Sequence, residues 1–296
     1  MLPLRNDTAA LPWKGLGASA KVLRRGGVLR GDADGIAPRR APARMKHWLK
    51  HIARPRIAAT CRRFASQIEF FHARLSRDSS LGLRLTLSVL LFIGATWLFA
   101  GIAEDVVTGD PLVEVDQLIT QWFHAHATPG LTRWMLIITD AHGVTSISVL
   151  GLLFGFYLLW RRNWYWLLTL AIALPGGMLL NVLLKLIFRR DRPSYDDPLL
   201  SLITYSFPSG HVTGATLFYG VLAAFLASGI TSWRRQMYVV IGAALVVILV
   251  GFTRIYLGVH YFSDVVAAAA WSTAWIVMWL VAIDAMRRSH YFKEQP

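Results

Sequence analysis

Six long apolar stretches follow one another from residue 85 onward, and they constrain the fold of this chain more than any other feature. A helix needs about 20 mostly apolar residues to cross a bilayer, and inside lipid it satisfies all of its own backbone polar groups. The candidate spans lie at about 85–103, 143–160, 164–187, 211–229, 237–252 and 264–284. We therefore predict an all-α, polytopic membrane protein with about six transmembrane helices.

The composition agrees with an apolar solvent around most of the chain. Hydrophobic residues make up 55% of the 296 residues and charged residues only 16%, whereas about 25% is usual in soluble domains. The net charge is +14, but residues 1–80 carry 17 Lys/Arg against five Asp/Glu, which gives that segment +12. A basic segment before a membrane helix binds anionic lipid and sets orientation, so we predict a bilayer partner and no nucleic acid.

These patterns divide the chain into three parts. Residues 1–80 are expected to form a basic cytoplasmic segment, in which 1–44 are rich in Gly, Ala, Pro and Arg and are expected to be disordered. Residues 81–286 are predicted to form the six-helix membrane domain, and 287–296 a cytoplasmic tail. Met45 is an alternative translation start. We therefore expect that removal of residues 1–44 leaves activity intact.

Arginine pairs between the spans predict the orientation. With six crossings, the pairs at 161–162, 234–235 and 287–288 lie on the same side as the basic N-terminus. Positively charged loops stay in the cytoplasm, so we expect both termini there. The loops 188–210 and 253–263 would then lie at the periplasmic face of a bacterial inner membrane. Loop 188–210 departs from the rule because it contains three arginines, which indicates that these charges serve another purpose.

The acidic stretch 104–130 also faces outward in this scheme. A short helix on the membrane surface is predicted there from apolar residues at helical spacing, namely Val115, Leu118, Ile119, Trp122 and Phe123. His124 and His126 follow. We interpret them as a solvated pair rather than metal ligands, and we expect no metal and no cofactor.

Three groups of polar residues stand at the outer ends of the predicted spans. The first is Lys185, followed seven residues later by Arg192. A lysine at mid-membrane costs roughly 2.5–3.5 kcal/mol and less near an interface, so its presence favours a function. A spacing of seven would put both cations on one face of a helix. The alternative is a lysine that merely extends its amine to the interface.

The second group is Pro208-Ser209-Gly210-His211, directly before the fourth span. A helix that begins there presents unpaired N–H groups and the positive end of its dipole, which together bind anions. An ordinary serine cap with a passing histidine is the alternative.

The third group is Thr253-Arg254, His260 and Asp264. The guanidinium of Arg254 matches the oxygens of a phosphate group. If His260 and Asp264 share the start of a helix, their spacing of four puts them on one face. A carboxylate there would fix the tautomer of the imidazole and stabilise its charged form. A helix-start salt bridge without chemistry is the alternative.

Together the groups bring three cations, a helix N-terminus and two histidines to one anion. Cations stabilise the charge on a transferring phosphoryl group, and histidines can attack it and protonate the leaving oxygen. The pattern therefore predicts phosphoryl transfer without a metal, at one face of the membrane.

These residues resemble the type 2 phosphatidic acid phosphatase family. The family pattern is Lys-x6-Arg-Pro, then Pro-Ser-Gly-His, then Ser-Arg-x5-His-x3-Asp, and it is matched over 185–193, 208–211 and 253–264. The one departure is Thr253 in place of Ser, which keeps the hydroxyl. The resemblance covers about 85–285 and implies a six-helix bundle with its site at the outer face.

The resemblance also implies roles. His260 would be the nucleophile that forms a phosphohistidine, Asp264 would orient it, and His211 would act as general acid and then as general base. Phosphate binding would fall to Lys185, Arg192, Ser209, Gly210 and Arg254. The family uses no metal for this reaction.

The substrate class follows from a site at the membrane boundary, where a lipid headgroup reaches it while the tails stay in the bilayer. The resemblance to the family implies four candidates, which are phosphatidic acid, phosphatidylglycerophosphate, undecaprenyl pyrophosphate and lipid A phosphates, and we favour the second and third. One alternative is a lipid phosphotransferase on the same site. Another is a non-catalytic lipid-binding or transport protein. The oligomeric state stays open.

Overall fold

The apolar stretches form helices throughout the described chain. This computed structural model describes residues 80–200 and 202–293, so the predictions for 1–79 lie outside the described residues. Within those two ranges the chain forms eight helices and no strand. They are α3 (Ser80–Thr108), α4 (Pro111–Ala125), α5 (Pro129–Asp140), α6 (Val144–Trp160), α7 (Trp164–Phe188), α8 (Gly210–Ser228), α9 (Trp233–Tyr256) and α10 (Phe262–Lys293). The predicted all-α fold is confirmed.

Five of the described helices are long and apolar enough to cross a membrane, namely α3, α7, α8, α9 and α10. Helices α5 and α6 pass the same test as a pair but are bent by 43° at the break between them, so the described chain has five such spans, or six if this pair is one. Large side chains on these helices stay exposed, among them Trp97 at 79% and Leu152 at 75%. Apolar surface of this extent is explained by contact with lipid.

Helix α4 is the short helix predicted within 104–130. Pro111 begins it, at the position where the missing N–H of proline costs nothing. Its buried positions, Asp116 and Thr120, are polar. The face that this helix turns toward the protein therefore carries hydrogen-bonding groups, which become important at the site.

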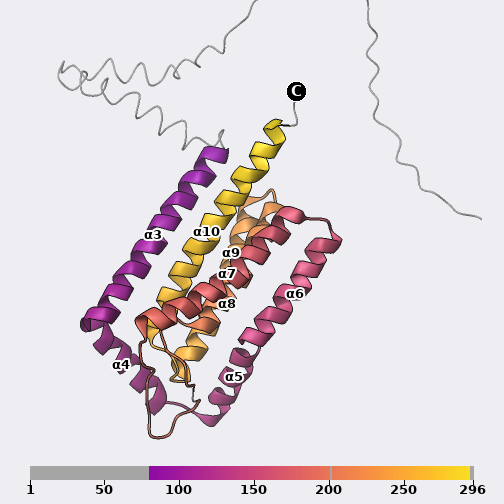
Figure 1. Cartoon of the computed structure of the whole chain (residues 1–296). Coiled ribbons are helices and arrows are strands. Elements are labelled where there is room, and N and C mark those ends of the chain that lie inside the picture. Colours follow the sequence, from indigo (N-terminus) through magenta and orange to yellow (C-terminus); the bar gives the residue numbers. More distant parts are fainter. Residues whose placement is uncertain (1–79, 201, 294–296) are drawn as a thin grey trace, which may run out of the picture. The chain divides into compact units, whose positions relative to one another are not determined.

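Helix α10 packs against α3, α7, α8 and α9 within this unit of the chain (Figure 1). The apolar core includes Leu170 and Leu174 of α7, Leu217 and Val221 of α8, and Ile276 of α10. A Cβ on Gly177 of α7 would lie 2.5 Å from Leu217. A larger residue at 177 would therefore require the Leu217 side chain to shift.

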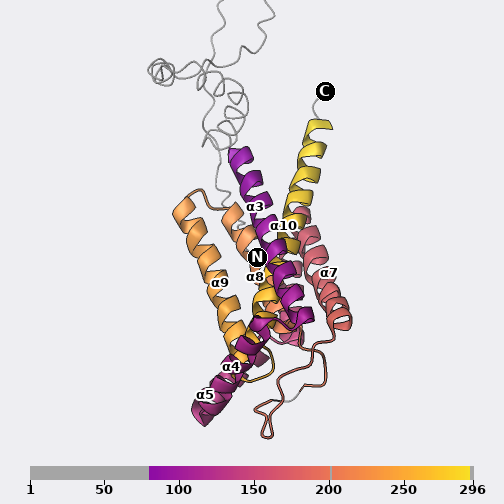
Figure 2. The ribbon, with the colours of Figure 1, turned by 90° about the vertical axis from the view of Figure 1, so that its left-hand side faces the viewer.

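Several of the connections lie together at one end of the bundle. Helices α4 and α5 and the segment between α7 and α8 lie at the end opposite the last turn of α10, as Figures 1 and 2 both show. The last turns of α7 and α9 and the first turns of α8 and α10 lead into this end. All three predicted groups are thus delivered to the same place.

Candidate active site

Four helix ends and two loops supply the eight predicted site residues. Lys185 lies in the last turn of α7 and Arg254 in the last turn of α9. Ser209 is the N-cap of α8, followed by Gly210 and His211, and Asp264 lies in the first turn of α10. The loop residues are Arg192 and His260.

The expectation that Lys185 and Arg192 share one helix face is wrong. Helix α7 ends at Phe188, and Arg189 adopts a left-handed conformation with φ 47°. The chain leaves the helix axis there, and the loop brings the Arg192 side chain back to the site. The two cations converge through the loop and not through helical periodicity.

His260 is 1% exposed and lies in the turn just before α10. Its Nδ1 is 3.2 Å from Oδ2 of Asp264. The same carboxylate oxygen accepts a hydrogen bond of 3.0 Å from the Tyr261 backbone N–H. Because the carboxylate accepts a hydrogen bond from Nδ1–H, the lone pair of a neutral His260 lies on Nε2.

Arg192 lies on the other side of the imidazole. Its Nη1 is 3.2 Å from Nε2 of His260 and donates to the Val259 carbonyl. Its remaining donors bind Thr204 and the Tyr205 carbonyl. Lys185 Nζ also donates to the Tyr205 carbonyl. One loop segment therefore anchors two of the predicted phosphate-binding cations.

Arg254 is held differently. It is 1% exposed, and its Nη1 donates to Oγ1 of Thr139 at the end of α5. Its Nε and Nη2 are buried without a hydrogen-bond partner among the described residues, and so is Oγ of Ser209. Unpaired buried donors cost about 1–3 kcal/mol each and more when charged. An anion that accepts from these groups would remove that cost.

The start of α8 is fixed from two neighbouring elements. Asn181 of α7 donates to the Pro208 carbonyl at 3.3 Å and to Thr213 Oγ1 at 3.0 Å. Ser209 makes no side-chain cap hydrogen bond, so its hydroxyl is not used as an ordinary cap. A Cβ on Gly143 would lie 3.9 Å from Nε2 of His211. The break between α5 and α6 therefore lies beside this histidine.

The charges around His260 determine its protonation. The pKa of His260 lies well below its ordinary value because burial disfavours the imidazolium, and because Arg192, Lys185 and Arg254 repel it. Burial likewise lowers the pKa of Arg192. His260 is therefore neutral at neutral pH, and its Nε2 lies within hydrogen-bonding distance of Nη1 of Arg192.

Comparison with known proteins identifies the family of this chain. The profile of the PAP2 superfamily matches residues 164–288. The chain is 34% identical over 177 residues to phosphatidylglycerophosphatase B of Bacillus subtilis (strain 168), an alignment that covers 57% of this chain and 83% of that protein. The chain belongs to the PAP2 superfamily.

Two further PAP2-type proteins extend the likeness. The probable lipid phosphate phosphatase beta of Arabidopsis thaliana is 28% identical over 181 residues, covering 54% of this chain and 84% of that protein. The crystal structure of a transmembrane PAP2-type phosphatidylglycerolphosphate phosphatase from Bacillus subtilis matches with a TM-score of 0.57 and 27% identity. That match covers 68% of this chain and 96% of that structure. The predicted family, multi-pass membrane fold and class of enzyme, a membrane lipid phosphatase, are confirmed.

Sequence reasoning missed three residues of this PAP2 site. The Thr139 hydroxyl accepts a hydrogen bond from Arg254. Arg190 donates to the carboxylates of both Asp264 and Asp116. Arg190 is one of the three arginines in loop 188–210, which departs from the rule that positively charged loops stay in the cytoplasm. That departure had indicated that these charges serve a purpose other than orientation. Asp116 had a weaker signal, a carboxylate on the same face of a surface helix as Leu112 and Thr120.

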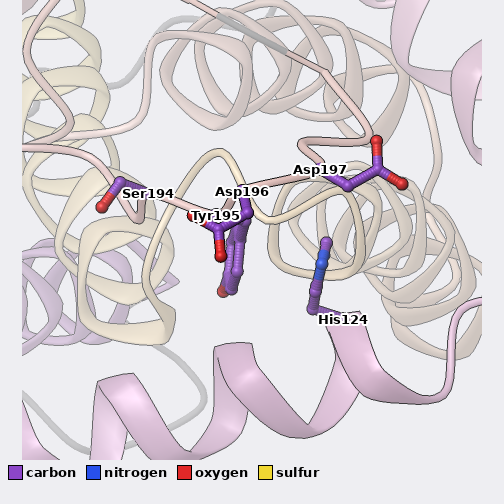
Figure 3. A pocket seen from close by; sticks show the side chains of 5 residues that line it. All are labelled: His124, Ser194, Tyr195, Asp196 and Asp197. Carbon is purple, nitrogen blue, oxygen red and sulfur yellow. The ribbon is translucent and has the colours of Figure 1, made fainter.

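A polar hollow of about 490 Å³ lies near this site and is lined by none of the eight predicted residues. Its walls are His124, Ser194, Tyr195, Asp196 and Asp197 (Figure 3). The ring of His124 stacks on Tyr195 with centroids 4.0 Å apart. Burial raises the pKa of Tyr195 to about 12, so its phenol stays neutral.

Proposed function

We propose that this PAP2 protein hydrolyses a phosphate or pyrophosphate ester of a membrane lipid through a phosphohistidine on His260. The observation that carries the proposal is the set of unpartnered buried donors on Arg254 and Ser209, at the end of the bundle where Nε2 of His260 faces Arg192. Donors left open in a buried site are worth most to an anion.

In the first step, Nε2 of His260 attacks phosphorus, and the bond from phosphorus to the lipid oxygen breaks. Asp264 accepts the Nδ1 proton in a hydrogen bond and stabilises the positive imidazole as the P–N bond forms. Lys185, Arg192 and Arg254 bind the phosphoryl oxygens. His211 gives its proton to the departing lipid oxygen, which leaves as an alcohol or, from a pyrophosphate, as a lipid monophosphate.

In the second step, a water oxygen attacks the phosphohistidine while His211 takes the proton of that water. The P–N bond breaks, inorganic phosphate leaves, and both histidines return to their starting protonation. No step is assigned to a metal ion.

Phosphatidylglycerophosphate is the substrate we favour first, because both the similar sequence and the similar crystal structure from Bacillus subtilis are named for that activity. Undecaprenyl pyrophosphate is the second. The loop charges of the chain support a site at the periplasmic face with both termini in the cytoplasm. In that arrangement the enzyme acts on lipids of the outer leaflet.

The test is phosphate release by detergent-purified wild type and His260→Ala, with EDTA present. The panel contains phosphatidic acid, phosphatidylglycerophosphate and undecaprenyl pyrophosphate. We expect EDTA-resistant turnover that is lost in the variant, and a phosphorylated wild-type protein in rapidly quenched, labelled reactions. Activity that survives His260→Ala, or that needs a metal, would overturn the mechanism. Transfer of labelled phosphate to another lipid, with little free phosphate, would indicate a transferase.

A further inference from the structure

Asp264 uses both of its carboxylate oxygens, and the second oxygen points away from the histidine. Oδ2 faces Nδ1 of His260, whereas Oδ1 accepts a hydrogen bond of 2.7 Å from Nη1 of Arg190. A carboxylate held at both oxygens cannot rotate about its own axis. The orientation of the Asp264 carboxylate relative to the imidazole is therefore determined in part by Arg190.

Arg190 is itself held by a second carboxylate. Its Nη2 donates to Oδ2 of Asp116 at 2.9 Å, and its guanidinium lies 4.2 Å over the centre of the Tyr261 ring. Its side chain is 9% exposed, and those of Asp116 and Asp264 are 0% exposed. The pKa of Arg190 is raised, since the two carboxylates outweigh the opposing effect of burial, so this group remains charged.

Asp116 also binds the residue next to Asp264. Its Oδ1 accepts from the Ser263 N–H at 2.9 Å, and its Oδ2 accepts from the Ser263 hydroxyl. Ser263 Oγ in turn lies 2.7 Å from Nη1 of Arg190. The surface helix α4 is thus tied to the first turn of α10 by a closed set of hydrogen bonds.

The charges of this set explain why two carboxylates are present. A single guanidinium bound to Asp264 alone would neutralise it and weaken its effect on the imidazole. Because Arg190 is shared with Asp116, the buried group of two carboxylates and one guanidinium keeps a net charge of −1. Within this group Asp264 is the carboxylate that contacts His260, and it can stabilise the imidazole when this becomes positive.

We propose that Arg190 and Asp116 are positioning residues for the reaction, which hold Asp264 in the orientation that fixes and polarises His260. This inference rests on the proposed function of the His260–Asp264 pair. Neither residue binds the phosphate in this scheme. Their loss should therefore reduce turnover while leaving the affinity of the site for phosphate unchanged.

The main variant is Arg190→Lys, which keeps the charge but cannot bridge two carboxylates as a planar fork does. We expect kcat on phosphatidylglycerophosphate or phosphatidic acid to fall roughly 100-fold, as for other small misplacements of reacting groups. The inhibition constant of inorganic phosphate should stay within about twofold of wild type, because all three phosphate-binding cations remain. The matched control is Arg189→Lys. The side chain of Arg189 is exposed and donates only to the Leu186 carbonyl among the described residues.

A double variant, Arg190→Gln with Asp116→Asn, removes one positive and one negative charge together, so the net charge of the buried group is the same as in wild type. Positioning predicts that this variant unfolds thermally near wild type yet keeps a low kcat. A merely structural role predicts instead that kcat recovers with stability, or that phosphate inhibition weakens as much as kcat falls. Either of those results, or an unchanged kcat in Arg190→Lys, overturns the inference.

His260→Ala is measured in the same assays, so that failure of the positioning role can be distinguished from failure of the proposed function. If His260→Ala is inactive and Arg190→Lys is fully active, only the positioning role fails. If His260→Ala retains activity, or wild type has none, the proposed function itself fails and the positioning role fails with it.

Discussion

Arg190 and Arg254 are two guanidinium groups at the same end of the bundle, and the protein treats them in opposite ways. Arg190 bonds two carboxylates and a hydroxyl. Arg254 bonds one threonine hydroxyl, and two of its nitrogens are buried without a partner in the described chain. The first has its charge balanced by the protein, while the second needs an anion from outside.

This difference shows how one residue type serves two purposes at one site. A guanidinium whose donors are occupied by protein carboxylates can only hold those carboxylates in place. A guanidinium whose donors are left open in a buried place is available to a phosphate. The surroundings of each arginine, rather than its charge, therefore indicate its role.

The largest expected effect tests the open arginine. Arg254→Gln should lower kcat/KM roughly 100- to 1,000-fold, because one preorganised donor of this kind contributes that much to a transition state. Inhibition by inorganic phosphate should weaken as well, in contrast to the expected behaviour of Arg190→Lys. Steady-state kinetics with added phosphate measure both. Unchanged phosphate inhibition in Arg254→Gln would break the comparison.

A smaller effect tests what holds the open arginine. Thr139→Val removes the hydroxyl that accepts from Nη1 of Arg254. We expect kcat/KM to fall about tenfold, corresponding to the loss of one hydrogen bond to a charged group. Thr139→Ser keeps the hydroxyl and should behave nearly as wild type. An equal loss in Thr139→Ser, which keeps the hydroxyl and lacks the methyl group, would show that the hydroxyl alone does not account for the effect.

The pH profile tests the effect of the cations on His260. A lowered pKa keeps the imidazole neutral as the pH falls through 6.5, so the acid limb of kcat/KM should lie below pH 6.5. The profile is corrected for the lipid phosphate, which titrates near pH 6 by analogy with other phosphate monoesters. Arg192→Gln removes a cation that lowers this pKa, so its limb should move to higher pH. A limb above pH 6.5 in wild type would contradict the expected protonation.

The smallest effect is expected at a distance from both arginines. Deletion of residues 1–44 should leave kcat and KM within about twofold of the full chain, since no predicted site residue lies there and distant changes act independently. Phosphate release after reconstitution into liposomes measures this. A truncated protein that inserts normally but loses turnover would show that the basic segment takes part in catalysis.

Much of the fold could be predicted because lipid imposes a simple rule on the chain. Apolar stretches of sufficient length have to be helices, and this locates α7 and α8 within one residue, whereas α3, α9 and α10 extend beyond the predicted spans, α10 by nine residues at its end. The bent pair α5 and α6 was harder, because α6 alone is 17 residues long. Its partner α5 could be anticipated only as apolar sequence before residue 143.

The candidate site was predictable where helix ends carry it and less so where loops do. Ser209, His211 and Asp264 lie as the motif spacing suggested. Arg192 does not, because the left-handed Arg189 ends α7 and redirects the chain. The helical period could place Asp116 on one face of α4 but could not predict its partner, since it meets Ser263 from 147 residues away.

The wide separation of these partners has a consequence for biosynthesis. Asp116 and the cation Lys185 enter the membrane well before α10, since chains are made and folded from the N-terminus. The nucleophile and its carboxylate arrive only with the last helix, when Asp116 finally meets Ser263. In the proposed mechanism, a ribosome-bound or prematurely terminated chain therefore has anion-binding groups but no means of cleaving an ester.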